Sequence, residues 1–276
     1  MRKILIGTVL FGLLFAACGE EETGQPTGSG SPAANACEED PPVLESGILT
    51  VATDRPAFPP WFEGSPKDYS GYEGELASEV ADRMGLEIKW VVEPFNKSYA
   101  PGEKDYDFDI NQIGITPERA QAVDFSDGYF DNGQGILALK DSELASATSL
   151  EDLKSAQLGT QVGTTSLTFI NEVIQPDSDP KVYDTTNDVK SALESGQLDG
   201  LVTDVVTTVY LRDFELDGTE VIGQFETDEE FGMLFEKGNP LVACVNDVLA
   251  EIREDGTLGE LQEEWLQDYL KVPTLE

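Results

Sequence analysis

Hydrophobic and polar positions predict strands and helices in alternation along the chain. A β-rich run predicts a strand at 47–52, alternation predicts another at 88–92, and apolar residues four apart predict a helix over 75–84 that Gly85 ends. The same patterns predict later strands at 108–113, 136–139, 158–162, 220–223 and 231–235, and later helices at 167–174, 186–195, 205–211, 240–254 and 258–270. This order is typical of an α/β protein.

The first 42 residues differ in composition from the rest. Two basic residues precede an apolar run over 4–17 that is too short to span a bilayer, so 1–17 is predicted to be a signal peptide. The run ends in Phe-Ala-Ala-Cys, which resembles the lipobox of bacterial lipoproteins. Cys18 is therefore the expected lipidated residue, and an ordinary cleavage site is the alternative. Residues 18–42, rich in Gly, Pro, Ser and Glu, predict a flexible tether on the outer face of the cytoplasmic membrane.

Two further cysteines, Cys37 and Cys244, remain once Cys18 is lipidated. An even pair in an exported protein predicts a disulfide. The alternative is one buried thiol and one free surface thiol.

The chain is strongly acidic and has no histidine. Its formal charge is −37, and removal of the signal peptide leaves 15 basic against 54 acidic residues, or −39. Such a charge argues against nucleic acid or anionic lipid as a partner, and an excess this large suggests a salty habitat. Without histidine, Ser-His-Asp and Cys-His catalysis and histidine-based metal sites are excluded. We expect no cofactor and no metal.

The most informative stretch is a predicted strand that runs into a predicted helix. Thr116 is a good N-cap, Pro117 fits the first helical position, and Glu118 falls in the first turn. Gly114 allows close approach of the backbone to a ligand. Arg119 adds a guanidinium beside unpaired helical N–H groups, a combination that receives a carboxylate well. A surface salt bridge is the alternative role for this arginine.

Polar residues spaced by two in the same stretch faintly resemble a calcium loop. Asp107, Asp109, Asn111 and Glu118 would supply ligands, but Gln112 stands where such a loop needs glycine. The alternation of the intervening apolar residues favours a strand instead.

Two later positions also suggest ligand contacts. A strand, a glycine loop and a helix start meet at Gly163, Thr164 and Thr165, which forms a natural anion cradle without the lysine of a nucleotide-binding loop. Asp204 stands at the start of the helix 205–211, where it is expected to be the N-cap.

The segment ITPERAQAVDFSDGYF, residues 115–130, resembles the signature of the polar amino-acid-binding proteins that feed ABC importers. The resemblance covers nearly all of the chain after about residue 43. It implies a two-lobed fold, with 43–131 plus 233–276 as lobe 1, 132–232 as lobe 2, and crossing hinges near 131–134 and 229–233. It also implies a monomer that delivers a small-molecule amino acid to an ABC permease.

The resemblance assigns roles to particular residues. It implies that the ligand carboxylate is held by Arg119, Gly114, Thr164 and Thr165, and the ligand ammonium by Asp204 and the carbonyl of Gln112. Phe58 and Phe95 would sandwich the ligand side chain, although each aromatic is otherwise ordinary core. Relatives often carry acids at the cleft edge where this chain has Glu73 and Glu75.

The expected ligand is cationic, because Asp54 lies at the lip of the proposed cleft and only Arg119 is assigned as a positive group there. Glutamine is the second choice, and aspartate and glutamate come last. The alternative is that Asp54 merely caps its own loop.

Two other functions fit the same resemblance. A cyclohexadienyl dehydratase would need a general acid in the cleft, and no histidine or evident buried glutamate pair offers one. A sensor module would be expected to continue into a transmembrane segment and signalling domain, whereas the chain ends at Glu276. Both are less favoured than a transport binding protein that performs no chemistry.

Overall fold

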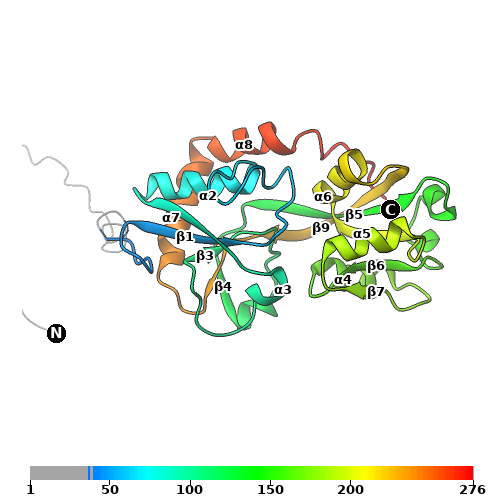
Figure 1. Ribbon diagram of the computed structural model, residues 1–276, viewed down its shortest axis with the longest axis horizontal. Helices are drawn as coiled ribbons and strands as arrows, with labels where there is room; N and C mark the ends of the chain where they lie inside the picture. Colours follow the sequence, from blue (N-terminus) through cyan, green and yellow to red (C-terminus); the bar gives the residue numbers. More distant parts are fainter. Residues whose placement is uncertain (1–36, 38–39, 276) are drawn as a thin grey trace, which may run out of the picture. The chain divides into compact units, whose positions relative to one another are not determined.

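The computed structural model describes residue 37 and residues 40–275. The predicted signal peptide, the lipid anchor at Cys18 and most of the tether over 18–42 lie outside the described residues. In the described part, the strands form two separate five-stranded sheets with helices packed against them (Figure 1). None of the described helices combines the length and apolar character needed to cross a membrane.

The first sheet has the strand order β2-β1-β3-β10-β4. β1 is parallel to β2 and β3, whereas β10 returns from late in the chain and runs antiparallel to β3 and β4. Its strands are β1 (Ile48–Thr53), β2 (Glu87–Val92), β3 (Phe108–Asp109), β4 (Val123–Phe125) and β10 (Leu234–Glu236).

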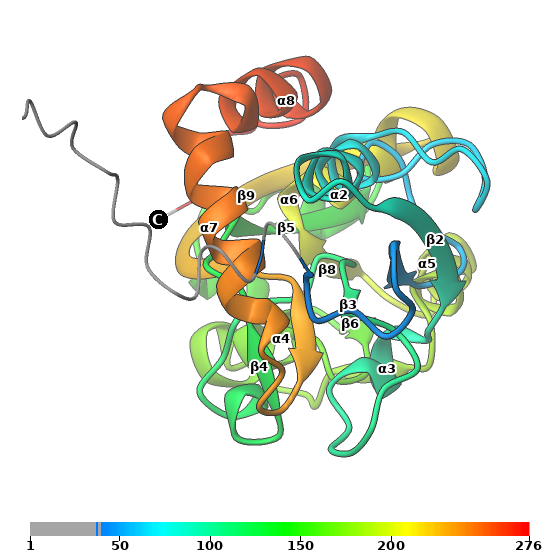
Figure 2. The same cartoon turned by 90° about the vertical axis from the view of Figure 1, so that its left-hand side faces the viewer.

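Three helices pack against the first sheet and contribute to its core. They are α2 (Tyr72–Arg83), α7 (Leu241–Glu254) and α8 (Thr257–Leu266), which pack against one another (Figure 2). Leu76 and Val80 of α2 and Val245 and Leu249 of α7 are fully buried. Their spacing by four places them on one face of each helix, as the sequence pattern predicted.

The second sheet has the strand order β7-β6-β8-β5-β9. Its strands are β5 (Phe130–Leu139), β6 (Leu158–Gln161), β7 (Lys181–Tyr183), β8 (Gly200–Asp204) and β9 (Thr219–Phe231). Neighbouring residues of β5 point to opposite faces, so Ile136 and Leu137 belong to different apolar clusters. The helices are α4 (Thr165–Phe169), α5 (Thr186–Glu194) and α6 (Val205–Tyr210), and α4 and α6 continue into π-helical turns at Ile170–Ile174 and Leu211–Glu215.

β5 and β9 pair antiparallel over their whole lengths, from Phe130 opposite Phe231 to Leu139 opposite Thr219. At one end both phenylalanines pack in the core of the first lobe, and at the other end the strands belong to the second sheet (Figure 1). The register shifts between Asn132 and Gly133, within the stretch predicted to be a hinge. The hinge itself stays a prediction.

The last described residues, 272–275, follow α8 and lie along β9, and we call them the C-terminal strap. The Gln224 N–H donates to the carbonyl of Pro273 at 2.9 Å, and the Leu275 N–H donates to the carbonyl of Gln224 at 2.8 Å. The sequence prediction grouped this segment with lobe 1, whereas its hydrogen bonds reach the second sheet.

Several predicted elements differ in length from those observed. The helix expected to open at Thr116 is a single 3₁₀ turn, Arg119–Gln121, because β4 begins two residues later. The Thr116 hydroxyl nevertheless caps it, accepting from the Arg119 N–H at 3.1 Å. The strand predicted over 108–113 ends at Asp109. Thr185, rather than Thr186, caps α5.

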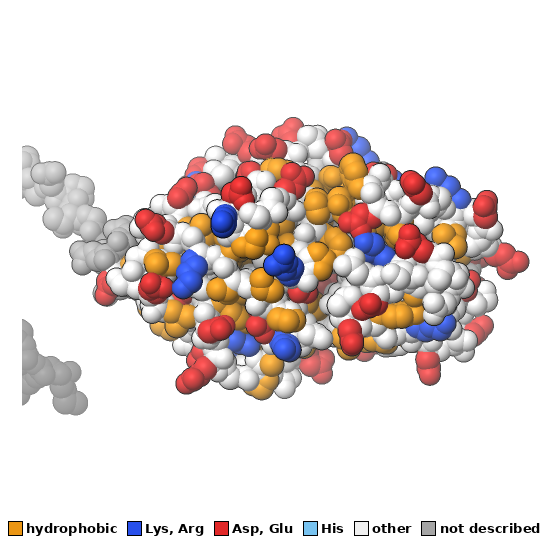
Figure 3. Space-filling view, viewed as in Figure 1, with side chains coloured by type: hydrophobic (Ala, Val, Ile, Leu, Met, Phe, Trp, Pro, Cys, Tyr) orange, Lys and Arg blue, Asp and Glu red, His pale blue; other side chains and the backbone are white. Residues whose placement is uncertain are grey.

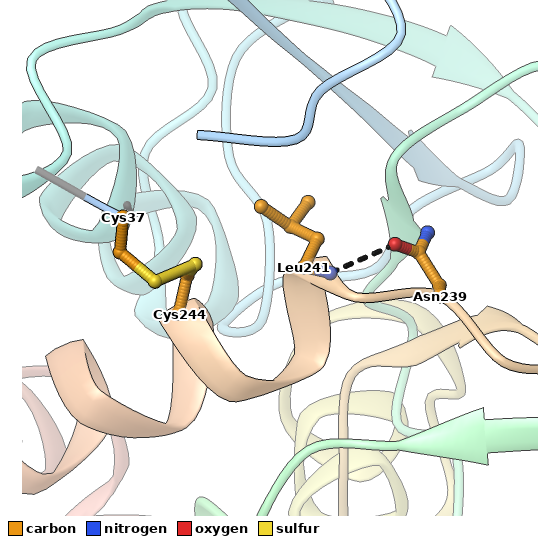
Figure 4. Close-up of a disulfide and its surroundings, with 4 residues drawn as sticks. All are labelled: Cys37, Asn239, Leu241 and Cys244. Carbon is orange, nitrogen blue, oxygen red and sulfur yellow. Dashed lines mark hydrogen bonds between the residues drawn. A yellow bond between two sulfur atoms is a disulfide. The ribbon is translucent and has the colours of Figure 1, made fainter. Parts of the chain in front are cut away.

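The predicted disulfide between Cys37 and Cys244 is confirmed, and the alternative of two thiols is wrong. The two Cα atoms are 5.4 Å apart, and the bond ties the segment before β1 to the first half of α7 (Figure 4). Near the start of the same helix, the Leu241 N–H donates to the Asn239 side chain at 2.9 Å, which satisfies one of the helix's free N–H groups.

Replacing both cysteines by serine should lower the free energy of unfolding by about 3–5 kcal/mol on the chain-entropy model, because the bridge closes a loop of 207 residues. Denaturant unfolding with and without reductant would measure this. Reductant should destabilise the wild type and leave the double variant unchanged. Equal midpoints for all four samples would show that the bridge contributes nothing.

Candidate functional site

A cavity lies where loops of the two lobes meet, and we call it the main cavity. The empty space between its lining residues, including the opening to solvent, is about 720 Å³. Polar side chains from both lobes make up most of the wall. From the first lobe come Asp54, Phe58, Phe95, Asn111 and Gln112, and from the second Gln134, Thr160, Thr164, Thr165, Ser166, Thr203 and Asp204.

Asp204 is the most deeply buried acid of the cavity wall, with 9% of its surface exposed. It ends β8 and caps α6, accepting a hydrogen bond from the Thr207 N–H at 2.8 Å, as predicted. Burial raises its pKa to about 6, and the nearby charge of Glu229 acts in the same direction. A positively charged ligand group at this carboxylate would relieve both effects.

Arg119 is also buried, but its guanidinium already has partners in this structure. It donates to the carbonyl of Gly114 at 2.7 Å and, across to the second lobe, to the carbonyl of Gly163 at 2.8 Å. The rings of Phe95 and Tyr99 lie 5.5 and 5.0 Å from it. Burial lowers its pKa from the ordinary value. Among the described residues Arg119 forms no salt bridge, which was the alternative role.

Arg119 lines a second cavity that adjoins the first, and we call it the side cavity. The two share Gln134, Thr164 and Thr165 in their walls. The side cavity also contains Glu229, whose Oε2 accepts from the side chains of Asn132 at 2.9 Å and Gln134 at 3.0 Å. A carboxylate arriving at Arg119 therefore has to share this region with an existing carboxylate.

Two glycines bring backbone close to these groups. A Cβ on Gly114 would lie 2.0 Å from Oε1 of Glu229, so the close approach predicted for this glycine is made by a side chain of the protein itself. Gly163 has φ +73°, and a Cβ there would lie 1.8 Å from the hydroxyl of Tyr99. A side chain at either position would have to displace Glu229 or Tyr99 from its place.

A helix N-terminus, that of α4, lies where an anion cradle was predicted. The Thr164 hydroxyl caps α4 by accepting from the Leu167 N–H at 3.2 Å. Among the described residues, no hydrogen bond acceptor engages the N–H groups of Thr164 and Thr165. These two donors are therefore available at the junction of the two cavities.

The residues proposed for the ligand side chain all line the main cavity. Asp54 lines it, yet its carboxylate also accepts from the backbone N–H groups of Arg55 at 2.6 Å and Phe95 at 3.2 Å, as the loop-capping alternative requires. Lys190 of α5 lies 5.6 Å from the ring of Phe58. Sequence reasoning missed this second cation, which is paired with Glu215.

Sequence reasoning also missed polar residues on β5 and misplaced one acid. Asn132 and Gln134 are buried and line the main cavity. The signal was two amides in a strand whose other residues, apart from Asp131, are apolar or glycine. Glu73, expected near the cleft edge, is fully buried behind Gln112, because the first turn of α2 directs it inward.

Acidic side chains are spread over the face seen in Figure 3, with fewer basic ones among them. Two α/β lobes with a polar cavity between their loops, and a buried carboxylate at a helix N-terminus in its wall, define a two-lobed solute-binding protein. The chain belongs to family 3 of the bacterial extracellular solute-binding proteins, whose family model matches residues 49–268. The predicted fold class and family are thereby confirmed.

Relatives of known function are binding proteins for polar amino acids. The L-cystine-binding protein TcyJ of Escherichia coli (strain K12) is 31% identical over 226 residues, covering 81% of this chain and 84% of the relative. An ancestral arginine-binding protein solved with arginine is 32% identical, with a TM-score of 0.70, over 80% of this chain and 98% of its own. AncCDT-1, an ancestral amino acid-binding protein and precursor of cyclohexadienyl dehydratase, is 29% identical, with a TM-score of 0.69, over 80% and 96%.

Proposed function

We propose that this protein captures a polar L-amino acid outside the cytoplasm and delivers it to an ABC permease in the cytoplasmic membrane. The observation that carries the proposal is the buried Asp204 in the wall of the main cavity. Among the described residues, this acid has no basic hydrogen-bonding partner. An α-ammonium would supply the missing positive charge. The names of the family's relatives support the same ligand class.

The ligand would lie with its α-carboxylate toward the junction of the two cavities. Its acceptor oxygens would meet Arg119 and the N–H groups of Gly114, Thr164 and Thr165. Its ammonium would lie between Asp204 and the carbonyl of Gln112, which among the described residues accepts no hydrogen bond. Since Arg119 donates to two carbonyls, binding of the carboxylate would replace at least one of them.

The protein would perform no chemistry on its ligand. A dehydratase needs a general acid that touches the substrate. The structure does contain a buried glutamate with a raised pKa, Glu73, but it lies behind Gln112 and outside the wall of the main cavity. Incubation with prephenate or arogenate distinguishes the two functions, and consumption of either compound would favour the enzyme.

Calorimetry against a panel of amino acids tests the proposal. Arg119→Ala and Asp204→Ala should each abolish detectable binding, because each leaves a buried ligand charge unpaired at a cost of about 3–5 kcal/mol. Arg212→Ala and Asp152→Ala are matched controls, since both residues are charged but lie outside the main cavity. Unchanged affinity in either test variant rules out the role given to that residue.

The pH dependence of binding gives a second readout for Asp204. Its pKa of about 6 exceeds the ordinary 3.8, so the ionised form that binds an ammonium is lost as the pH falls through 6. Affinity should then fall about tenfold for each further pH unit. Asp204→Asn, if it retains measurable binding, should lack this dependence.

The preferred side chain is proposed to be cationic, with glutamine second and acidic amino acids last. Asp54 would receive the positive charge at the far end of the ligand side chain. Lys190 is paired with Glu215, so its charge does not oppose that of the ligand. In competition experiments, Asp54→Asn should weaken arginine binding by about tenfold, or about 1.4 kcal/mol, and affect glutamine little. Tightest binding of glutamate, or an arginine affinity that Asp54→Asn leaves unchanged, would overturn this preference.

The mature protein is proposed to be a monomer held at the outer face of the membrane by a lipid on Cys18. The support is the lipobox-like Phe-Ala-Ala-Cys after an apolar run. Cys18→Ser should move the protein from the membrane to the soluble fraction, as cell fractionation would show. Equal membrane association of variant and wild type would contradict lipidation.

A further inference from the structure

Gln112, whose carbonyl faces the proposed ammonium, has an unusual backbone conformation. Its φ is +48°, in the left-handed region that a residue with a side chain adopts only when its surroundings enforce it. Gln112 and the preceding residue, Asn111, both lie in the wall of the main cavity. Some group must therefore hold this backbone in place.

The group that contacts Gln112 most extensively is the carboxyl of Glu73. Its Oε1 accepts from the backbone N–H of Gln112 at 2.8 Å, and its Oε2 accepts from the side-chain amide of the same residue. The hydroxyl of Tyr129 donates to Oε1 as well. Backbone and side chain of Gln112 are thus held by one carboxyl group.

Glu73 is itself fixed from several sides. It lies in the first turn of α2 with no exposed surface, and its N–H donates to the carbonyl of Trp61 at 3.0 Å. The helix starts after Gly71, which has φ +92° and where a Cβ would lie 2.6 Å from that same carbonyl. The Tyr72 hydroxyl donates to the carbonyl of Tyr129 at 2.8 Å, which helps to position Tyr129, the residue whose hydroxyl donates to Glu73.

We propose that Glu73 is a positioning residue for ligand binding: it holds Gln112 in the left-handed conformation in which its carbonyl receives the ligand ammonium. The inference rests on the proposed function and deepens it. Glu73 does not line the main cavity, and of the residues to which it is hydrogen-bonded only Gln112 does. Burial raises the pKa of Glu73 to about 8, and its Oε1 can accept its two hydrogen bonds with or without a proton on the other oxygen.

A double-mutant cycle separates this role from a merely structural one. Glycine adopts positive φ without support, so Gln112→Gly keeps the carbonyl in place without needing Glu73. Glu73→Ala removes both acceptor oxygens. It should weaken amino-acid binding about tenfold in the wild-type background, and should have no more than about a twofold effect in the Gly background. Calorimetry with arginine and glutamine on all four proteins provides the measurement.

The possible outcomes are distinct. An equal loss in both backgrounds, or no loss in either, overturns the positioning role while the proposed function stands. If the wild type binds no amino acid, the proposed function fails and this inference fails with it. Tyr129→Phe removes one donor and leaves the carboxyl in place, so it covers the case in which Glu73→Ala does not fold. It should weaken binding only when residue 112 is glutamine, and equal weakening in both backgrounds would again contradict positioning.

Discussion

The antiparallel pairing of β5 with β9 is the constraint on which the binding site depends. β5 begins at Phe130 and β9 ends at Phe231, and both residues lie in the core of the first lobe. The other ends of the two strands form one edge of the second sheet. They therefore set the distance between the two walls of the main cavity. A second link is the hydrogen bond of 3.1 Å from the indole N–H of Trp61 to the hydroxyl of Thr207, whose own N–H donates to Asp204.

Burial and charge act against each other throughout the site. Three carboxyl groups, Glu73, Asp109 and Asp204, are buried, and desolvation raises their pKa values to about 8, 7 and 6. Only Asp204 lines the main cavity, and there the same burial that disfavours its charge strengthens its attraction to a ligand cation. The other two hold neighbouring loops through hydrogen bonds to Gln112, Tyr129 and Ser98.

Local patterns in the sequence were enough to predict the elements whose form depends on periodicity. The helix α2, the strand β2 and the helix pair at the end of the chain follow from apolar spacing, and the capping role of Asp204 follows from its position before a helix. What could not be predicted depends on distant partners. Arg119 donates to Gly163, 44 residues away, and Gln112 owes its backbone conformation to Glu73, 39 residues away. No local pattern contains either contact.

The C-terminal strap has a consequence for association between molecules. β9 is the last strand of its sheet, and an edge strand exposes unpaired N–H and carbonyl groups that can accept a strand from another chain. At Gln224 both groups are already bonded to the strap, and the side chain of the same residue donates to the carbonyl of Val272 at 3.0 Å. The middle of this edge is therefore occupied by the protein's own backbone and closed to intermolecular strand addition.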